Sequence, residues 1–333
     1  MSPKRTTKKK NAETSASTKS ATGPAADLAS FPLGSTGKLH PPFGLGLWAL
    51  GRWAREDEAR TKAAVGRALE RRIRWFDTAE VYGNGRSERL LGEVLSRAGA
   101  GATTPFLVTK VSWEHLRASQ VRAACLASLH RLGRSSVDVY LVHAPDSHTP
   151  IQETMRALED LWKEQRIGAV GVSNFSSQQL EAAGEALREA PLVVNQVRYN
   201  LFDREEGEEV LETCRKHRIV MEAYTPFARG LLVGRYLDGE RPSDSARRFS
   251  RRFFEGDQFP EMVRRAQRLR ELAVEAKVPM ASIALHWLLR QGVAPVFGAS
   301  RPEQVDEVVE SSLQRPSDAI LDRADEIARG NRA

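Results

Sequence analysis

The stretch PFLVTKVSWEHLRASQVRAACLASLHRLGRSSVDVYLVH, residues 105–143, alternates a short apolar run, an amphipathic segment and a second apolar run. The runs at 105–110 and 137–143 have the length and the valine and leucine content of buried strands. Residues 119–132 instead carry apolar side chains at the three- and four-residue spacing of a helix. The stretch therefore predicts a strand, a helix and a second strand parallel to the first.

The same rhythm continues over most of the chain. Strands are predicted at FGLGLW (43–48), IRWFDT (73–78), PFLVTK (105–110), VDVYLVH (137–143), GAVGVS (168–173), LVVNQV (192–197), IVMEAY (219–224) and VAPVFG (293–298). Helices are predicted at 57–71, 86–97, 119–132, 151–165, 176–188, 205–217, 261–291 in two pieces, and 302–311. This order predicts an α/β fold, a (β/α)8 TIM barrel with a long loop near 226–260 between strands seven and eight and extra C-terminal helices.

An open doubly wound sheet is the alternative architecture. When it binds a dinucleotide, such a sheet usually carries G-x-G-x-x-G after its first strand. Here FGLGLWALG has no third glycine in register, and Gly83 and Gly85 continue as RSER. The segment GSTGK near Gly34 also lacks the first glycine of a phosphate loop, so we interpret it as a turn or an entry hairpin. The barrel remains the better prediction.

The positive charge of the chain is concentrated at its start. Residues 1–30 contribute +4 of the net charge of +7 and contain almost no large apolar side chains. We interpret 1–30 as a disordered basic tail and 31–333 as a single barrel domain. The tail could attract nucleic acid weakly, but it lacks the interleaved aromatic side chains that stack on bases, so a nucleic-acid partner is not expected.

Composition also limits the cellular setting. With 41% hydrophobic and 28% charged residues, the chain resembles a globular protein, and no stretch has the length of uncharged apolar sequence that a membrane helix needs. We expect a cytoplasmic protein with no membrane association and no specific protein partner. Cys125 and Cys214 lie in separate predicted helices, so we expect them to be buried, reduced thiols.

Polar residues close three consecutive predicted strands. Asp77, Lys110 and His143 end strands two, three and four, and the carboxyl ends of barrel strands meet at one mouth. Tyr82 lies in the loop five residues beyond Asp77. A lysine close to a phenol lowers its pKa, so we expect Lys110 to make Tyr82 an acid and base usable near neutral pH. His143 would donate to a carbonyl oxygen at the same mouth.

This group of residues needs a hydride donor, because the chain shows no evident serine or cysteine nucleophile and no HExxH or Cys/His spacing for a metal. Trp48 follows the first predicted strand and Trp113 the third, so both are candidates for an aromatic substrate pocket. Each of these residues alone has a structural explanation: Asp77 and Lys110 could be a plain ion pair. Their joint occurrence at consecutive strand ends favours a functional site.

Five motifs in order, DTAEVYGNG (77–85), LVTK (107–110), LVHAPD (141–146), GVSNF (171–175) and VFGASRPEQVDE (296–307), resemble the aldo-keto reductase family. The resemblance covers roughly residues 31–311. It implies a catalytic tetrad of Asp77, Tyr82, Lys110 and His143. It implies nicotinamide contacts from Ser173, Asn174, Gln196 and the ring of Tyr224. TPFARGLL resembles the segment covering the pyrophosphate, implying Thr225, Phe227, Arg229 and Leu231. GASRPEQ resembles the adenosine phosphate site, implying Gly298, Ser300, Arg301, Gln304 and Glu307.

The resemblance implies reduction of a small aldehyde or ketone by NADPH. Arg301 beside Ser300 favours NADP(H) over NADH, because a guanidinium can bind a phosphate through two hydrogen bonds. Family members often have an asparagine where this chain has Val308, which weakens the implied adenine contact. A cofactor-sensing regulatory or accessory subunit with little turnover is the alternative, because the family includes a channel accessory subunit that keeps the tetrad.

Overall fold

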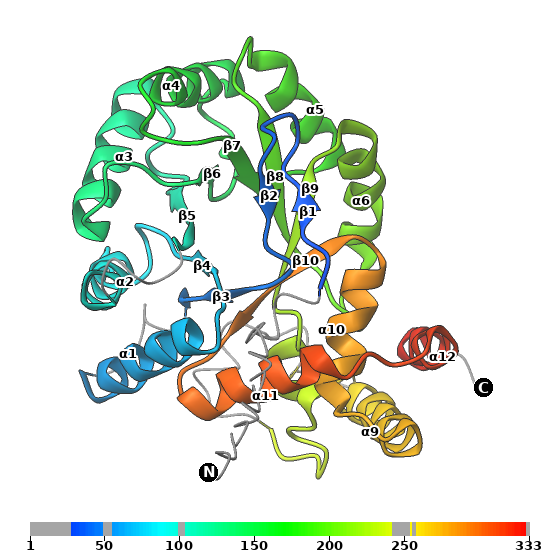
Figure 1. Ribbon diagram of the computed structural model, residues 1–333. Helices are drawn as coiled ribbons and strands as arrows, with labels where there is room; N and C mark the ends of the chain where they lie inside the picture. The colour runs from blue at the N-terminus through cyan, green and yellow to red at the C-terminus, as the bar shows by residue number, and fades with distance from the viewer. Residues whose placement is uncertain (1–27, 49–54, 99–103, 242–253, 255–257, 331–333) are drawn as a thin grey trace, which may run out of the picture.

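A closed barrel of parallel strands forms the centre of the computed structural model, which describes residues 28–48, 55–98, 104–241, 254 and 258–330 (Figure 1). The strands are β3 (Gly44–Gly46), β4 (Trp75–Asp77), β5 (Phe106–Val111), β6 (Val139–Val142), β7 (Val170–Ser173), β8 (Leu192–Arg198), β9 (Val220–Tyr224) and β10 (Val293–Gly298). They pair in chain order, and β10 closes the barrel by pairing with both β3 and β9. The predicted (β/α)8 barrel is confirmed, with each strand inside its predicted run or within one residue of it.

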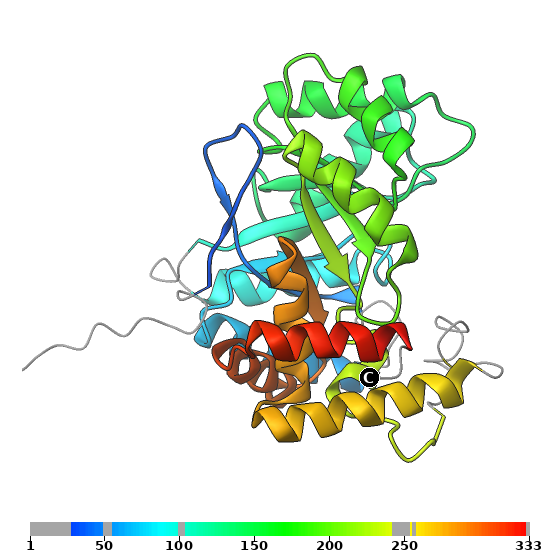
Figure 2. The ribbon, with the colours of Figure 1, turned by 90° about the vertical axis from the view of Figure 1, so that its right-hand side faces the viewer.

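Helices cover the outside of the barrel (Figure 1). They are α1 (Arg55–Glu70), α2 (Arg86–Arg97), α3 (Ala118–Leu132), α4 (Ile151–Lys163), α5 (Ser177–Ala186), α6 (Glu205–His217), α9 (Gln258–Ala276), α10 (Met280–Arg290), α11 (Pro302–Leu313) and α12 (Asp318–Arg329). The predicted two-piece helix between strands seven and eight is α9 and α10, preceded by the 3-10 helix η3 (Ala228–Val233). The expected extra C-terminal helix is α12, which packs beside α9 (Figure 2).

Some sequence predictions lie outside the described residues. The tail prediction falls almost wholly on residues 1–27, and part of the predicted 226–260 loop falls on 242–253 and 255–257. The buried positions predicted for Cys125 and Cys214 are confirmed. Within the described ranges, no single helix has the length and apolar composition of a membrane span, although the pair α9 and α10, bent by 94°, passes that test together.

A short hairpin covers the end of the barrel at which the strands begin. Its strands are β1 (Phe31–Pro32) and β2 (Leu39–His40), and Figure 1 shows them in front of β8 and β9. Gly34 and Gly37 adopt positive φ angles in the turn, which glycine does at little cost. The GSTGK segment is therefore a hairpin turn, as the sequence predicts. Leu33 inserts into the apolar interior of the barrel from this side.

Two apolar clusters hold the barrel and its helices together. One fills the barrel interior with side chains such as Trp75, Val108 and Leu141. The other lies between strands and helices and includes Phe76 and Leu107. Neighbouring residues of one strand thus face opposite sides, as the two-residue repeat of a strand requires. This alternation decides which side chains reach the mouth.

Candidate active site

The inward faces of β4, β5 and β6 each lead to a polar side chain at the carboxyl end of the strand. On β5, Phe106 and Val108 belong to the interior cluster, and Lys110 is the next residue on that face. The same step leads from Trp75 to Asp77 on β4, and along β6 it leads to His143 just beyond the strand. The fold therefore collects these side chains at the carboxyl end of the barrel.

Asp77 and Lys110 form a buried ion pair. Lys110 Nζ donates to both Asp77 carboxylate oxygens at 2.7 Å and to the Thr78 carbonyl oxygen at 2.9 Å, which uses all three ammonium protons. Burial acts to lower the pKa of Lys110, but the Asp77 carboxylate and Tyr82 outweigh it and the pKa is raised. Burial raises the pKa of Asp77, and Lys110 opposes that effect. Lys110 is thus held as a cation.

Tyr82 lies against this cation but does not have the expected acidity. Lys110 Nζ is 5.2 Å from the centroid of the Tyr82 ring. Burial nevertheless raises the pKa of Tyr82 to about 12, and Lys110 only partly offsets it. The prediction that Lys110 brings this pKa below its usual value is therefore wrong, because loss of hydration of the phenolate outweighs the nearby charge. Tyr82 is a proton donor at neutral pH.

His143 is a neutral imidazole beside Tyr82. The two rings meet edge to face, with centroids 5.5 Å apart. Burial, with Lys110 acting in the same direction, lowers the pKa of His143 to about 3. Its Nδ1 atom is buried and has no hydrogen-bond partner among the described residues. A neutral ring still donates one hydrogen bond, so His143 can orient an oxygen atom without carrying charge.

These side chains line a cavity of about 440 Å³ at the mouth of the barrel. Its lining includes most of the predicted residues: Trp48, Asp77, Tyr82, His143, Ser173, Asn174, Gln196, Tyr224, Thr225, Phe227, Arg229, Gly298, Ser300, Gln304 and Glu307. Four predicted residues lie outside it. Lys110 and Leu231 are buried and do not line the cavity. Arg301 is exposed at the start of α11. Trp113 is 44% exposed, and the centroid of its ring is 5.7 Å from that of the His143 ring.

Asn174 connects the ends of three strands. Its Nδ2 donates to the His143 carbonyl oxygen and to Ser173 Oγ, each at 3.0 Å, and its Oδ1 accepts from the Tyr224 hydroxyl at 2.8 Å. Its φ of 59° is left-handed, a conformation that asparagine tolerates better than most residues. Asn174 thereby fixes Ser173 and Tyr224 at one side of the cavity.

The chain beyond β9 is strained where it borders the cavity. Thr225 has a φ of 56° and Arg229 a φ of 57°, and a β-branched residue such as Thr225 rarely adopts this region. Asn200 Nδ2 donates to the Thr225 carbonyl oxygen at 3.1 Å and helps to hold the turn. The Arg229 guanidinium lies 4.5 Å from the centroid of the Trp48 ring. Such strain concentrates at functional sites.

The start of α11 also lines the cavity, through Ser300 and Gln304. Ser300 donates to Gln304 Oε1 through its backbone N–H at 2.8 Å and through its hydroxyl at 3.2 Å. A helix N-terminus favours an anion, because its first N–H groups have no partner within the helix. This end of the cavity is therefore suited to a phosphate group.

Several lining residues were not identified from the sequence as site residues. They are Gly46, Pro226, Gly230, Val233, Arg235, Val296, Phe297, Ala299 and Val308. Most of these are neighbours of motif residues, and Arg235 is a cation beyond the end of the TPFARGLL segment. Val308, noted in the sequence as a departure from the family pattern, lines the cavity as an apolar side chain.

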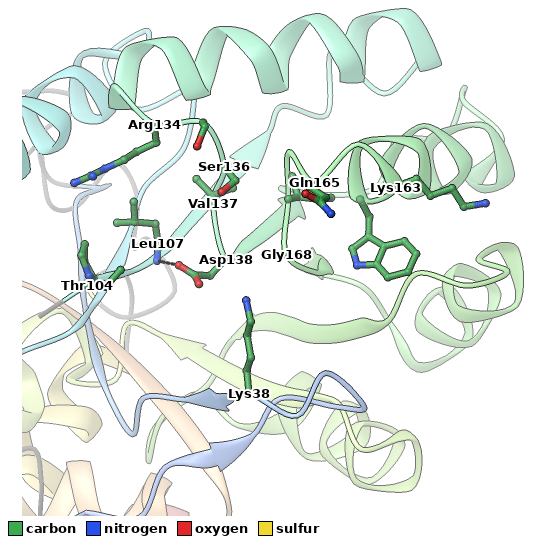
Figure 3. Close-up of a pocket in the computed structure, with 14 residues that line it drawn as sticks. Lys38, Thr104, Leu107, Arg134, Ser136, Val137, Asp138, Lys163, Gln165 and Gly168 are labelled. Carbon is green, nitrogen blue, oxygen red and sulfur yellow. Dashed lines mark hydrogen bonds between the residues drawn. The ribbon is translucent and has the colours of Figure 1, made fainter.

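A second hollow, of about 760 Å³, lies at the opposite end of the barrel. Figure 3 shows Lys38 of the hairpin extending toward Asp138, whose carboxylate accepts a hydrogen bond from the Leu107 backbone N–H at 2.8 Å. Among the described residues that line it, no buried polar side-chain atom lacks a hydrogen-bond partner. Nothing in its lining points to a ligand.

The mouth cavity fits a nicotinamide dinucleotide. Among the described residues, none donates a hydrogen bond to Gln196 Oε1 and none pairs with the buried Thr225 Oγ1, so the lining has unused polar atoms. The α11 N-terminus, which suits a phosphate, lines the same cavity. In the described part of the chain, no three His, Cys, Asp or Glu side chains are grouped to hold a metal ion.

Comparison with known proteins agrees with the family resemblance of the sequence motifs. The family model described as the Aldo/keto reductase family matches residues 42–329. The chain is 31% identical over 291 residues to the aldo-keto reductase YhdN of Bacillus subtilis, covering 84% of this chain and 87% of that protein. It is 28% identical over 313 residues to an NADH-specific methylglyoxal reductase of Escherichia coli, covering 86% of this chain and 94% of that one.

Solved structures show the same architecture. A glycerol dehydrogenase from Gluconobacter oxydans matches with a TM-score of 0.81 and 29% identity, covering 92% of this chain and 96% of that one. An aldo/keto reductase from Klebsiella pneumoniae, solved in complex with NADP and acetate, matches with a TM-score of 0.72 and 25% identity, covering 90% and 95%.

Proposed function

The chain belongs to the aldo/keto reductase family of oxidoreductases, and from this premise we propose that it reduces an aldehyde or ketone to an alcohol with NADPH. The observation that carries the proposal is the placement of the Tyr82 ring in the mouth cavity, between the Lys110 ammonium and the His143 ring. A small carbonyl compound is the substrate class that such a proton donor serves.

Each residue of the site has a separate role at the carbonyl oxygen of the substrate. NADPH, when bound, supplies the hydride. Tyr82 donates the proton, and its raised pKa keeps that proton in place at neutral pH. As the proton leaves, the Lys110 ammonium stabilises the phenolate, and Asp77 holds Lys110 in position. Neutral His143 orients the oxygen by a hydrogen bond.

Preference for NADP(H) over NADH is part of the proposal. Arg301 is the exposed N-cap residue of α11, beside Ser300, and it has no ion-pair partner among the described residues. Arg235, unlike Arg301, lines the mouth cavity. One guanidinium at a helix N-terminus and a second on the lining of the mouth cavity support binding of an additional phosphate. A relative that is NADH-specific shows that the preference must be measured for this chain.

Substrate selection is assigned to the aromatic side chains at the mouth. Trp48 lines the cavity, and Trp113 lies at its rim against His143. We propose that both tryptophans contact the apolar part of the carbonyl compound. Trp113 makes its contact after the substrate has entered the cavity. The cytoplasmic location predicted from composition remains a prediction.

The experiment combines binding and turnover. NADPH binding is titrated calorimetrically, and turnover of aromatic aldehydes, quinones and dicarbonyls is followed at 340 nm, for the wild-type protein and Tyr82→Phe. We expect equal NADPH affinity and a loss of turnover of about 100-fold or more in the variant, because proton transfer contributes about that much. Tyr199→Phe is the control, since the Tyr199 hydroxyl bonds Gln291 away from the cavity.

The outcomes separate the two functions considered from the sequence. Turnover that survives in Tyr82→Phe would refute the assigned role of the phenol. Tight NADPH binding by the wild-type protein without turnover of any carbonyl compound would instead support a cofactor-sensing subunit.

A further inference from the structure

We propose that Glu222 and His40 are positioning residues of the nicotinamide site, which hold the Gln196 amide with its oxygen toward the mouth cavity. The inference rests on the proposed function, because it assumes that a nicotinamide carboxamide binds there. Neither residue has an evident role in the sequence, and neither lines the cavity.

Gln196 donates both of its amide protons to carboxylates. Its Nε2 lies 2.9 Å from Asp77 Oδ2 and 2.6 Å from Glu222 Oε2. An amide nitrogen has two hydrogens, so these two acceptors use its whole donor capacity. Gln196 and Glu222 are register partners on β8 and β9, which places them side by side on the inner face of the barrel.

This arrangement selects one of the two orientations of the amide. Rotation by half a turn would place Gln196 Oε1 against two carboxylates and leave Glu222 Oε2 without a donor, which is costly for a buried group. In the observed orientation Oε1 receives no hydrogen bond from a described residue, and Gln196 borders the cavity. The oxygen is therefore available to accept from a carboxamide NH2 group.

His40 fixes the other end of Glu222. Both side chains are fully buried, and His40 Nε2 lies 2.9 Å from Glu222 Oε1. The imidazole meets the rings of Trp75 and Phe106 edge to face, with ring centroids 4.4 and 5.0 Å away. Its other nitrogen, Nδ1, lies 2.7 Å from the Pro41 carbonyl oxygen. A hydrogen bond between His40 and Glu222 and one from Gln196 to Glu222 thereby connect the hairpin at the base of the barrel to the lining of the mouth cavity.

The role of Glu222 does not depend on where the shared proton lies. Both nitrogens of His40 face oxygen atoms, so either His40 carries two protons or Glu222 Oε1 carries one and donates it. In both cases Glu222 Oε2 remains an acceptor for Gln196. Glu222 thus acts through its acceptor oxygen, and glutamine can replace it: its NH2 donates to His40 Nε2 and its oxygen accepts from Gln196.

The test measures recognition of the carboxamide by equilibrium binding. The probes are NADP+ and its 3-acetylpyridine analogue, in which a methyl group replaces the amide NH2. The wild-type protein is expected to bind NADP+ more tightly than the analogue, and Glu222→Leu to lower that affinity ratio by about 2- to 10-fold, the worth of one hydrogen bond. Glu222→Gln should keep the ratio, and Gln196→Leu should lower it as Glu222→Leu does.

Glu159→Leu controls for general loss of stability. Glu159 is a buried carboxylate that accepts from the backbone N–H groups of residues 188–190, outside the barrel interior. The inference is overturned if Glu222→Leu keeps the wild-type ratio, or if Glu159→Leu lowers it equally. Failure of the wild-type protein to bind either nucleotide would instead overturn the proposed function.

Discussion

The lowered pKa of His143, which keeps its imidazole neutral, predicts a measurable pH dependence of folding stability. In the folded protein its pKa is lowered from 6.5 to about 3 by burial and by Lys110. Between these two values the unfolded chain binds a proton and the folded chain does not. Stability from this group is therefore fully present above pH 6.5 and is lost as the pH falls toward 3.

The size of the effect follows from the two pKa values. On lowering the pH from 7 to 5, the histidine of the unfolded chain becomes almost fully protonated while His143 in the folded protein stays neutral. Each pKa unit corresponds to about 1.4 kcal/mol, so the free energy of unfolding should fall by about 2 kcal/mol from this residue alone.

The assay is urea unfolding of the wild-type protein and of His143→Gln at both pH values. Glutamine is polar and does not titrate, so the difference between the two pH dependences isolates His143. The wild-type protein should lose about 2 kcal/mol more than the variant. Equal losses would show that His143 titrates normally in the folded state, and the neutral imidazole assigned to the site would be refuted.

Two further predictions concern stability. Lys110→Met should lower the free energy of unfolding by about 3–5 kcal/mol, because it leaves the Asp77 carboxylate buried without its cation. In urea unfolding, adding Asp77→Leu to this variant should recover part of the loss. A double variant that is less stable than Lys110→Met would contradict the reasoning. Gly44→Ala should cost about 1–3 kcal/mol, because a Cβ atom there would overlap the Trp75 indole, whereas Gly66→Ala in α1, which meets no atom within 4 Å, should gain about 0.5–1 kcal/mol. If Gly44→Ala and Gly66→Ala changed the stability equally in thermal unfolding, the proposed overlap with the Trp75 indole would be excluded.

The barrel and the positions of Asp77, Lys110 and His143 were predictable for one physical reason. Buried parallel strands are nearly continuous apolar runs, and a polar residue within or just after such a run stands out. Lys110 and His143 are such residues, and the two-residue repeat carries both to the inner face. The sequence alone therefore places these side chains at one mouth.

The acidity of Tyr82 was not predictable in this way. Proximity of a cation follows from strand order, but the extent of burial depends on how the loops pack around the ring. Burial turned out to be the larger effect, which reversed the sign of the expected pKa change. The same limit applies to Leu231 and Arg301, since a motif identifies a segment and not the side chains that face the cavity.

The group formed by His40, Glu222 and Gln196 depends on contacts between distant parts of the chain. Glu222 is an acid in the apolar run IVMEAY, and a buried acid needs a partner. That signal is present in the sequence, but the partner, His40, is 182 residues away on the hairpin. Only the closed barrel brings the two together.

Hydride transfer to a carbonyl carbon is the central claim, and isotope transfer tests it most directly. The wild-type protein is supplied with NADPH that carries deuterium in both positions at the reactive ring carbon, together with an aromatic aldehyde, and the alcohol is analysed by mass spectrometry. We predict one deuterium on the alcohol carbon with the wild-type protein and almost no alcohol with Tyr82→Phe. Alcohol without deuterium, or equal alcohol from Tyr82→Phe, would contradict the mechanism.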